Sequence, residues 1–229
     1  MKGDFFMNFF VTPYVDEYGD TTYNLTGAGY TALILVFIAL LVIGAAIFGT
    51  KKKMSAKQLV FSAMAIALAT VTSMIKLFDM PMGGSVTLFS MLFIVLIGYW
   101  YGLGGGLTAA IAYGVLQLLI DPYMLSFPQM LTDYLLAFGA LGLSGIFSNS
   151  KHGLIKGYIA AVLGRYFFAF LSGWIFFGMY APDNFPNAVV YSLAYNGAYL
   201  GAEAALTLII IALPPVSKAL ATVKKQAVN

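Results

Sequence analysis

Seven long apolar runs, separated by short breaks rich in glycine, proline and charge, account for most of this chain of 229 residues. An α-helix needs about 20 apolar residues to cross the hydrocarbon of a bilayer, so seven passes use about 140 residues. Hydrophobic residues make up 61% of the chain and charged residues only 9%, whereas soluble domains carry about 25% charged residues. The sequence therefore predicts an all-α integral membrane protein without a separate soluble catalytic domain.

The predicted transmembrane helices have turn-forming breaks between them, and in chain order they are 30–49, 56–77, 86–101, 106–120, 130–147, 153–179 and 188–213. The first run ends at three lysines, the reverse of the charge order in a signal peptide, so we expect it to stay as a helix. We expect three parts: an extracytoplasmic tail (1–26), an extra N-terminal transmembrane helix (27–53) and a six-helix substrate-binding membrane domain (54–229).

The basic residues fall on one side of this predicted topology. With the N-terminus outside, nine of the twelve basic residues lie in the cytoplasm: Lys51, Lys52, Lys53, Lys57, Lys151, Lys156, Lys218, Lys224 and Lys225. An excess of lysine and arginine marks the cytoplasmic side of a membrane protein. We therefore expect an outside N-terminus, a cytoplasmic C-terminus and a place in the cytoplasmic membrane of a bacterial cell.

Three ionisable side chains lie inside predicted helices: Asp133, Arg165 and Glu203. A charge at the bilayer centre costs at least about 2.5–3.5 kcal/mol on insertion scales, so such residues are functional candidates by default. Asp133 lies one turn from the outer end of its helix, where a carboxylate suits the capture of a cation. For the deeper Glu203 we favour a structural role, with Arg165 as its partner.

Further polar and aromatic side chains gather near the outer ends of the helices. Asn196, Tyr199 and Glu203 lie at i, i+3 and i+7, on one face of the last helix. The others are Tyr113, Gln117, Tyr123, Tyr134, Trp174 and Phe177. Interfacial aromatic belts explain such residues singly, but together they predict an outward pocket for a small, flat, polar and cationic ligand.

The second predicted helix carries two pairs of small residues four apart, Ala63 with Ala67 and Ala65 with Ala69. Small residues at this spacing let two membrane helices approach closely. The pairs indicate either packing within the chain or contact with a membrane partner.

Two short motifs do not support an enzyme. Gly142-Leu143-Ser144-Gly145 matches the pattern of intramembrane serine proteases, but the only histidine, His152, lies beyond the end of the helix, and the serine needs a base within hydrogen-bond reach. The glycine-rich stretch 102–106 lacks the Gly-Lys-Ser/Thr of a phosphate loop. One histidine and no cysteine also leave no metal site, and we expect neither catalysis nor a cofactor.

Several spaced motifs resemble one family. They lie at 83–88 (GGSVTL), 114–117 (GVLQ), 121–123 (DPY), 133–138 (DYLLAF), 164–166 (GRY), 171–173 (LSG) and 195–199 (YNGAY). Together they resemble the thiamine-specific substrate-binding component, or S-component, of energy-coupling factor (ECF) transporters, over about 55–213. The resemblance implies a six-helix bundle, a vitamin site near the outer surface, and partners comprising a transmembrane coupling subunit and two ATPase subunits.

The resemblance also implies particular site residues. The loop between the first two family helices caps the vitamin, and here it includes Met82, Gly83 and Gly84. The family's ligand positions fall on or near Asp133, Tyr134, Tyr113, Tyr123, Gly173, Tyr191, Asn196 and Phe177. Asp133 stands where the family has a glutamate, and Ala169 where it has a ligand-contacting histidine. The small-residue pattern at Ala63, Ala65, Ala67 and Ala69 corresponds to the family's contact with the coupling subunit.

We therefore expect a high-affinity vitamin-binding subunit, with thiamine as its first candidate ligand. The changes at Asp133 and Ala169 leave room for another flat heterocycle, such as a form of vitamin B6 or a thiamine precursor. A free-standing transporter that uses protons at Asp133 or Glu203 is the alternative of a different class, although the sequence shows no inverted repeat typical of such carriers.

Overall fold

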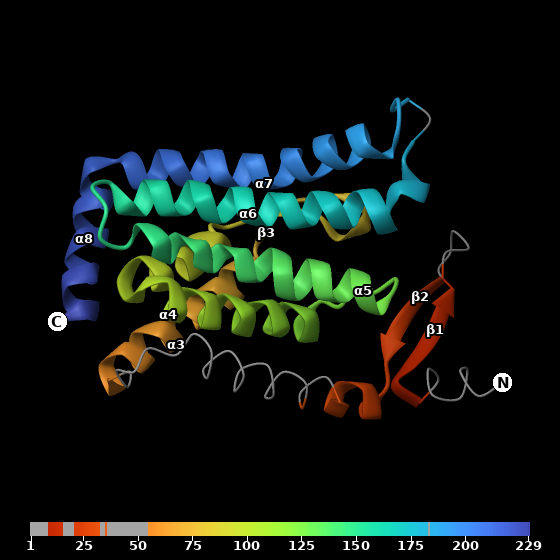
Figure 1. Cartoon of the computed structure of the whole chain (residues 1–229), viewed down its shortest axis with the longest axis horizontal. Coiled ribbons are helices and arrows are strands. Elements are labelled where there is room, and N and C mark those ends of the chain that lie inside the picture. Colours follow the sequence, from red (N-terminus) through yellow and green to blue (C-terminus); the bar gives the residue numbers. More distant parts are fainter. Residues whose placement is uncertain (1–8, 16–20, 33–34, 36–54, 183) are drawn as a thin grey trace.

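The computed structural model describes residues 9–15, 21–32, 35, 55–182 and 184–229. Within them, five helical segments are long and apolar enough to cross a membrane: α3 (Ala56–Ser73), α4 (Ser90–Ile120), Phe127–Phe147, α6 (Gly153–Phe176) and α7 (Ala188–Ala212). Figure 1 shows most of them side by side along the long axis. The fold is mostly helical, as predicted. Apart from 30–32 and 35, the predicted helix at 30–49 lies outside the described residues.

Helix α4 contains two of the predicted helices, and the predicted break between them occurs at Gly102. This glycine has φ 79° and ψ −172°, which is not helical. A Cβ added to Gly106 would lie 2.8 Å from the Cα of Gly98, although eight residues of straight helix span about 12 Å. The chain therefore turns back on itself at Gly102, and glycine permits the positive φ there.

The two halves of α4 pack closely against the helical segment η3 (Ala140–Phe147). Glycines line this contact, and a Cβ on Gly142 would lie 2.5 Å from the backbone nitrogen of Leu107. The hydroxyl of Ser144, which is fully buried, donates to the carbonyl of Val95 at 3.0 Å. Small residues thus let the backbones approach, as is usual between membrane helices, and Ser144 has a structural hydrogen bond.

The fifth predicted helix is not a regular α-helix. It starts with α5 (Phe127–Met130), continues as the π-helical stretch η2 (Leu131–Ala137) and ends in η3, which has 3₁₀ geometry. π-helical turns are rare and frequently occur at functional sites. Asp133 lies in this stretch.

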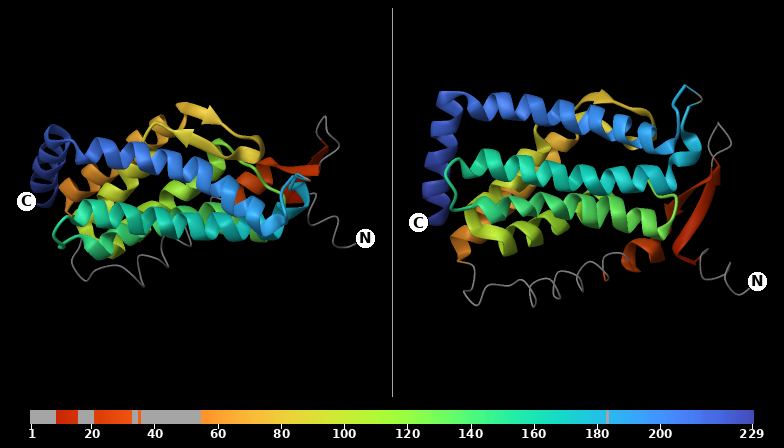
Figure 2. Two further views of the ribbon diagram at one scale, coloured as in Figure 1. Left: turned by 90° about the horizontal axis from the view of Figure 1, so that it is seen from above. Right: turned by 45° about the horizontal axis from the view of Figure 1, so that its top comes forward.

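Short antiparallel hairpins were not predicted. Strands β3 (Lys76–Asp79) and β4 (Ser85–Thr87) form one hairpin, with the 3₁₀ turn η1 (Pro81–Gly83) at its tip. It replaces the end of one predicted helix and the start of the next, and Figure 2 shows it beside α7. Strands β1 (Val11–Val15) and β2 (Thr21–Leu25) form another hairpin within the predicted tail.

The carboxylate of Glu203 on α7 holds the base of the β3–β4 hairpin. It accepts hydrogen bonds from the backbone nitrogen and hydroxyl of Thr87, at 2.9 and 2.7 Å, and from the backbone nitrogen of Met91 at 3.3 Å. Ser90 donates a longer bond of 3.5 Å. Met91 lies in the first turn of α4, where free N–H groups and the helix dipole favour a negative charge.

This arrangement corrects the predicted pairing of Glu203 with Arg165. The guanidinium of Arg165 lies over the ring of Phe138, 4.0 Å from its centroid. The described residues contain no ion pair between the two side chains. Glu203 has the predicted structural role, but its partners are donors at the start of α4.

Helix α8 (Pro214–Val228) follows α7 and lies across the end of the bundle (Figure 1). The ammonium of Lys224 donates to the carbonyl of Ser148 at 2.5 Å and lies 3.6 Å from the centroid of the Tyr99 ring. Partial burial lowers the pKa of Lys224. The hydroxyl of Tyr101 also donates to the carbonyl of Ala227. Helix α8, which carries the C-terminal lysines, is therefore packed against the end of the bundle through Lys224 and Ala227.

The glycine contact gives a first prediction. Gly142→Ala places a methyl group against the backbone of α4, which cannot move aside as a flexible side chain can, so we expect a loss of about 1–3 kcal/mol in stability. The measurement is the midpoint of thermal unfolding in detergent. Gly201→Ala is the matched control, because its new Cβ meets nothing within 4 Å. An unchanged midpoint for Gly142→Ala would contradict the packing described here.

The anchor at Glu203 gives a second prediction. Glu203→Gln keeps one acceptor oxygen but directs an NH₂ group at a neighbouring donor, so we expect a loss of about 1.5–3 kcal/mol in stability. Thermal unfolding measures it, with Lys218→Gln on the exposed face of α8 as the control. Equal midpoints for the two variants would show that the carboxylate does not carry this contact.

Candidate functional site

A cavity of about 170 Å³ lies among α4, η2, α6, α7 and the β3–β4 hairpin. Nine of the ten predicted ligand-binding residues line it: Tyr113, Gln117, Tyr123, Asp133, Tyr134, Gly173, Phe177, Tyr191 and Asn196. The hairpin tip adds Met82, Gly83 and Gly84. Residues that are up to 114 positions apart in the sequence thus share one site.

Trp174 is the exception, since it is not among the residues that line this cavity. Its side chain is 46% exposed, and its ring stacks on Phe170 with the centroids 6.0 Å apart. Gly173 and Phe177 are four residues apart on α6, so they share the face that lines the cavity. Trp174 lies on another face, where an interfacial aromatic residue is common.

Asp133 is held in the cavity wall by Gln129. The amide nitrogen of Gln129 donates to Oδ2 of Asp133 at 2.6 Å and to the carbonyl of Tyr123 at 3.2 Å. The amide oxygen of Gln129 accepts from the backbone nitrogen of Leu125 at 3.0 Å. The hydroxyl of Ser172 also lies close enough to the carboxylate of Asp133 to interact with it, so a ligand at Asp133 would meet both side chains.

The phenol groups of Tyr134 and Tyr113 hold the cavity walls together. The Tyr134 hydroxyl donates to the carbonyl of Asp121 at 3.0 Å and accepts from the backbone nitrogen of Tyr123 at 2.8 Å. The Tyr113 hydroxyl donates to the carbonyl of Ala69 at 3.3 Å. Because both hydroxyls are already bonded to the backbone, these residues offer a ligand mainly their rings.

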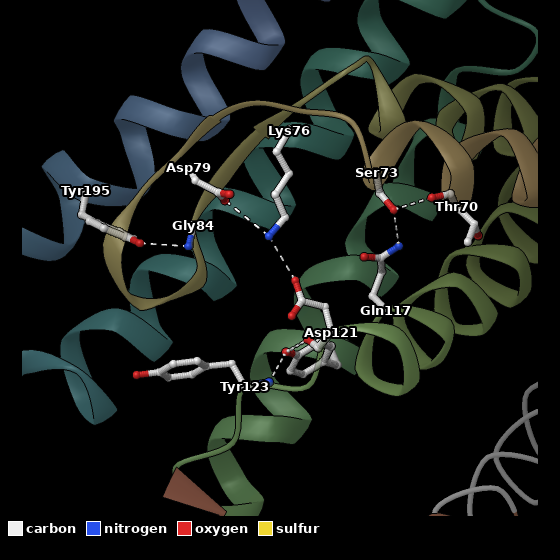
Figure 3. Close-up of polar contacts among 10 residues, drawn as sticks. Thr70, Ser73, Lys76, Asp79, Gly84, Gln117, Asp121, Tyr123 and Tyr195 are labelled. Carbon is white, nitrogen blue, oxygen red and sulfur yellow. Dashed lines mark hydrogen bonds and ion pairs between the residues drawn. The ribbon is translucent and has the colours of Figure 1, made fainter. Parts of the chain in front are cut away.

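Gln117 and Asn196 also have partners within the protein. Gln117 donates to the hydroxyl of Ser73 at 2.9 Å (Figure 3). Asn196 donates to Ser192, and its amide oxygen accepts from the hydroxyl of Tyr199 at 3.1 Å. A ligand that binds Asn196 must share or replace these bonds. The predicted side of the helix is correct, since Asn196, Tyr199 and Glu203 all line the cavity.

Aromatic rings form one end of the cavity. The rings of Tyr123 and Phe177 stack at 5.7 Å with an angle of 29° between their planes. Tyr134 stacks on Phe138 at 6.2 Å with an angle of 22°. These flat surfaces and the carboxylate of Asp133 line the same space, a combination that suits a flat cationic ring.

The structure adds cavity residues that were not among the predicted ligand contacts: Lys76, Gln129, Arg165, Ser172, Ser192, Tyr195 and Tyr199. Ser172 is 1% exposed, and its hydroxyl has no hydrogen-bond partner in the described residues. Arg165 could have been included from its charge within a span, because an unpaired guanidinium needs acceptors. Ala169, four residues further along α6, also lines the cavity.

Lys76 links the hairpin to the loop after α4. Its ammonium lies 3.2 Å from the carboxylate of Asp121 and 3.4 Å from that of Asp79 (Figure 3). Burial opposes the charge, but the bonds and charges of Asp121 and Asp79 outweigh it and raise the pKa of Lys76. The ion pair is exposed, so salt screens it and its contribution is small.

The four predicted partner-contact residues on α3 divide into two faces. Ala65 and Ala69 are 3% and 0% exposed and pack in the core of the chain. Ala63 and Ala67 are exposed. Ala65 and Ala69 therefore pack within the chain, the first of the two alternatives for these pairs, whereas Ala63 and Ala67 remain the residues that a partner could reach.

The chain is similar to known membrane transporters. The sequence pattern of the thiamine transporter protein family (Thia_YuaJ) matches residues 59–222. The chain is 35% identical over 168 residues to thiamine transporter ThiT of Bacillus subtilis (strain 168), covering 67% of this chain and 85% of that protein. It is 29% identical over 127 residues to thiamine transporter ThiT of Lacticaseibacillus paracasei, covering 48% and 63%.

A solved structure of ThiT from Listeria monocytogenes superposes with a TM-score of 0.62 at 27% identity, covering 74% of this chain and 96% of that one. With the apolar helices, these relatives identify a multi-pass cell membrane protein. They are transporters, so the prediction of a function other than catalysis is confirmed. The chain belongs to the thiamine transporter protein family, and the predicted resemblance to the thiamine-specific S-component is confirmed.

Proposed function

We propose that this chain is the substrate-binding subunit of an energy-coupling factor transporter and that it captures thiamine at the outer face of the cytoplasmic membrane. The observation that carries the proposal is the carboxylate of Asp133, held by Gln129, in a cavity walled by aromatic rings. Thiamine joins a positively charged thiazolium ring to an aminopyrimidine ring. Asp133 complements the charge and amine of such a ligand, and the rings of Tyr123 and Phe177 offer stacking surfaces.

Arg165 and Ser172 support a ligand that also carries hydrogen-bond acceptors. Arg165 has no hydrogen bond to an acceptor within the described residues, Ser172 lies beside the carboxylate of Asp133, and both line the cavity. A buried donor without a partner costs roughly 1–3 kcal/mol. A heterocycle with ring nitrogens would satisfy such donors while its cationic part faces Asp133.

Ala169 favours an alternative ligand in place of thiamine. This residue is 7% exposed and lines the cavity, whereas the resemblance implies an imidazole at its position. The smaller side chain leaves extra space and removes one polar group. Another flat heterocycle, either a form of vitamin B6 or a thiamine precursor, is therefore the alternative within the same class.

The partners follow from the family resemblance. We infer that Ala63 and Ala67, the exposed pair on α3, contact the transmembrane coupling subunit, which two ATPases serve. Uptake into proteoliposomes tests this inference. We expect transport only when the coupling subunit and ATPases are present with ATP. Uptake by this chain alone, driven by a proton gradient, would instead support the free-standing proton-coupled transporter.

Asp133→Asn gives a test of the ligand contact. Removal of the charge should weaken thiamine binding about 10- to 100-fold, which corresponds to roughly 1.5–3 kcal/mol for a charged hydrogen bond. Titration calorimetry on the purified protein measures the affinity. Trp174→Phe is the control and should bind within about twofold of the wild type, because Trp174 faces away from the cavity. Equal affinities for wild type and Asp133→Asn would rule out this role.

The ligand itself can be identified by thermal shift with a panel of thiamine, the three forms of vitamin B6 and the aminopyrimidine precursor of thiamine. We expect thiamine to raise the unfolding midpoint most, because ligand binding stabilises the folded state. A larger shift with another compound would reassign the ligand. Ala169→His should then reduce the preference for that compound, since the imidazole fills the additional space.

A further inference from the structure

We propose that Tyr195 holds the tip of the β3–β4 hairpin closed over the cavity, while Glu203 keeps the base of the hairpin in place. Tyr195, which we call the latch, would then set how long a ligand stays in the cavity. This inference rests on the proposed function only for the identity of the ligand. Tyr191, Tyr195, Tyr199 and Glu203 are spaced four residues apart on α7, so they form one stripe along the helix. We call it the α7 stripe.

The tip of the hairpin is bonded to the upper part of the α7 stripe. The hydroxyl of Tyr195 accepts from the backbone nitrogen of Gly84 at 2.9 Å and donates to the carbonyl of Pro81. Figure 3 shows the bond to Gly84. One hydroxyl thus spans the turn at the tip. The hydroxyl of Tyr191 adds a weak contact of 3.8 Å with the sulfur of Met82.

The base of the hairpin is bonded to the lower part of the stripe through Glu203 and Thr87. The two attachments match in spacing. Eight residues of α-helix from Tyr195 to Glu203 span about 12 Å, and three residues of strand from Gly84 to Thr87 span about 10 Å. Strand β4 therefore lies along α7, which agrees with the contacts between these elements.

The two attachments differ in strength. Glu203 and Thr87 are 3% and 8% exposed, and their bonds include a charged acceptor, which makes them stronger than bonds between neutral groups. At the tip, Pro81 and Gly83 are exposed while Gly84 is buried, and the bonds to Tyr195 join neutral groups. The ion pair of Lys76 with Asp121 is also exposed. The tip therefore separates first, while the base stays in place.

Removing the latch should change the rate of ligand release. Met82, Gly83 and Gly84 line the cavity, so separation of the tip opens one of its walls. Tyr195 acts through the hairpin backbone, which makes it a positioning residue. Loss of the Tyr195 hydroxyl should raise the dissociation rate without slowing association. Loss of a side chain that touches the ligand would, in addition, remove binding energy while the hairpin is closed.

The experiment compares Tyr195→Phe with the wild type by stopped-flow fluorescence with thiamine. Loss of a neutral hydrogen bond predicts a dissociation rate about three- to tenfold higher, with an association rate that is equal or higher. Tyr166→Phe is the matched control, because its hydroxyl donates to the carbonyl of Leu193 on α7 and not to the hairpin. A dissociation rate equal to that of the wild type would overturn the proposal.

A second measurement does not depend on thiamine. The chain has no cysteine, so spin labels can be attached through Phe78→Cys on β3 and Val190→Cys on α7, which are 62% and 39% exposed. We expect Tyr195→Phe to broaden the distance distribution between the labels in ligand-free protein, and Tyr166→Phe to leave it unchanged. Equal distributions in all three proteins would overturn the latch.

The two measurements separate this inference from the proposed function. If thiamine does not bind the wild type, the ligand assignment fails, and the label distances still decide whether Tyr195 holds the hairpin. If thiamine binds and Tyr195→Phe alters neither its release nor the label distances, the latch fails while the ligand assignment stands.

Discussion

Hydrogen bonds made by a few buried polar side chains determine how the bundle is arranged around the cavity. Inside a bilayer, a polar group has no water to bond, so it needs a partner from the protein. Glu203 satisfies free backbone groups at the start of α4 and fixes the base of the β3–β4 hairpin. Tyr134 and Gln129 similarly fix the loop after α4. The cavity lies between these fixed parts, and its shape depends on them.

The site uses its polar side chains in two ways. Tyr113, Tyr134 and Gln117 have hydroxyl or amide groups already bonded within the protein, and they present rings or aliphatic surface to the cavity. Asp133, Arg165 and Ser172 line the same cavity with charged and hydroxyl groups that the backbone does not occupy. The first group builds a stable wall, and in the proposed function the second group would recognise the ligand.

The sequence was sufficient to predict the helical membrane fold and the break near Gly102, and nine of the ten proposed ligand contacts line the cavity. They gather there because apolar length reports membrane spans directly and because polar groups in a span must face the protein interior. Trp174 does not line the cavity, since an aromatic residue at a helix end suits either a pocket or the interface. Helical spacing from Gly173 and Phe177 separates the two.

The strands and the Glu203 contact could not be predicted in the same way. Residues 78–85 were predicted only as a break between two helices, and the hairpin forms through contacts with α7, more than 100 residues away in the chain. Arg165 was an obvious partner for Glu203 by charge alone. Thr87, Ser90 and Met91, at and just before the start of α4, supply several hydrogen-bond donors at once. Together they satisfy the carboxylate of Glu203 at least as well as a single cation would.

The π-helical stretch that contains Asp133 has a geometric consequence for its side chains. In a π-helix each backbone hydrogen bond spans five residues instead of four. The side chains of η2 therefore leave the backbone in directions that a regular α-helix through the same residues would not give. The direction of the Asp133 carboxylate thus depends on the local winding of the backbone as well as on its place in the sequence.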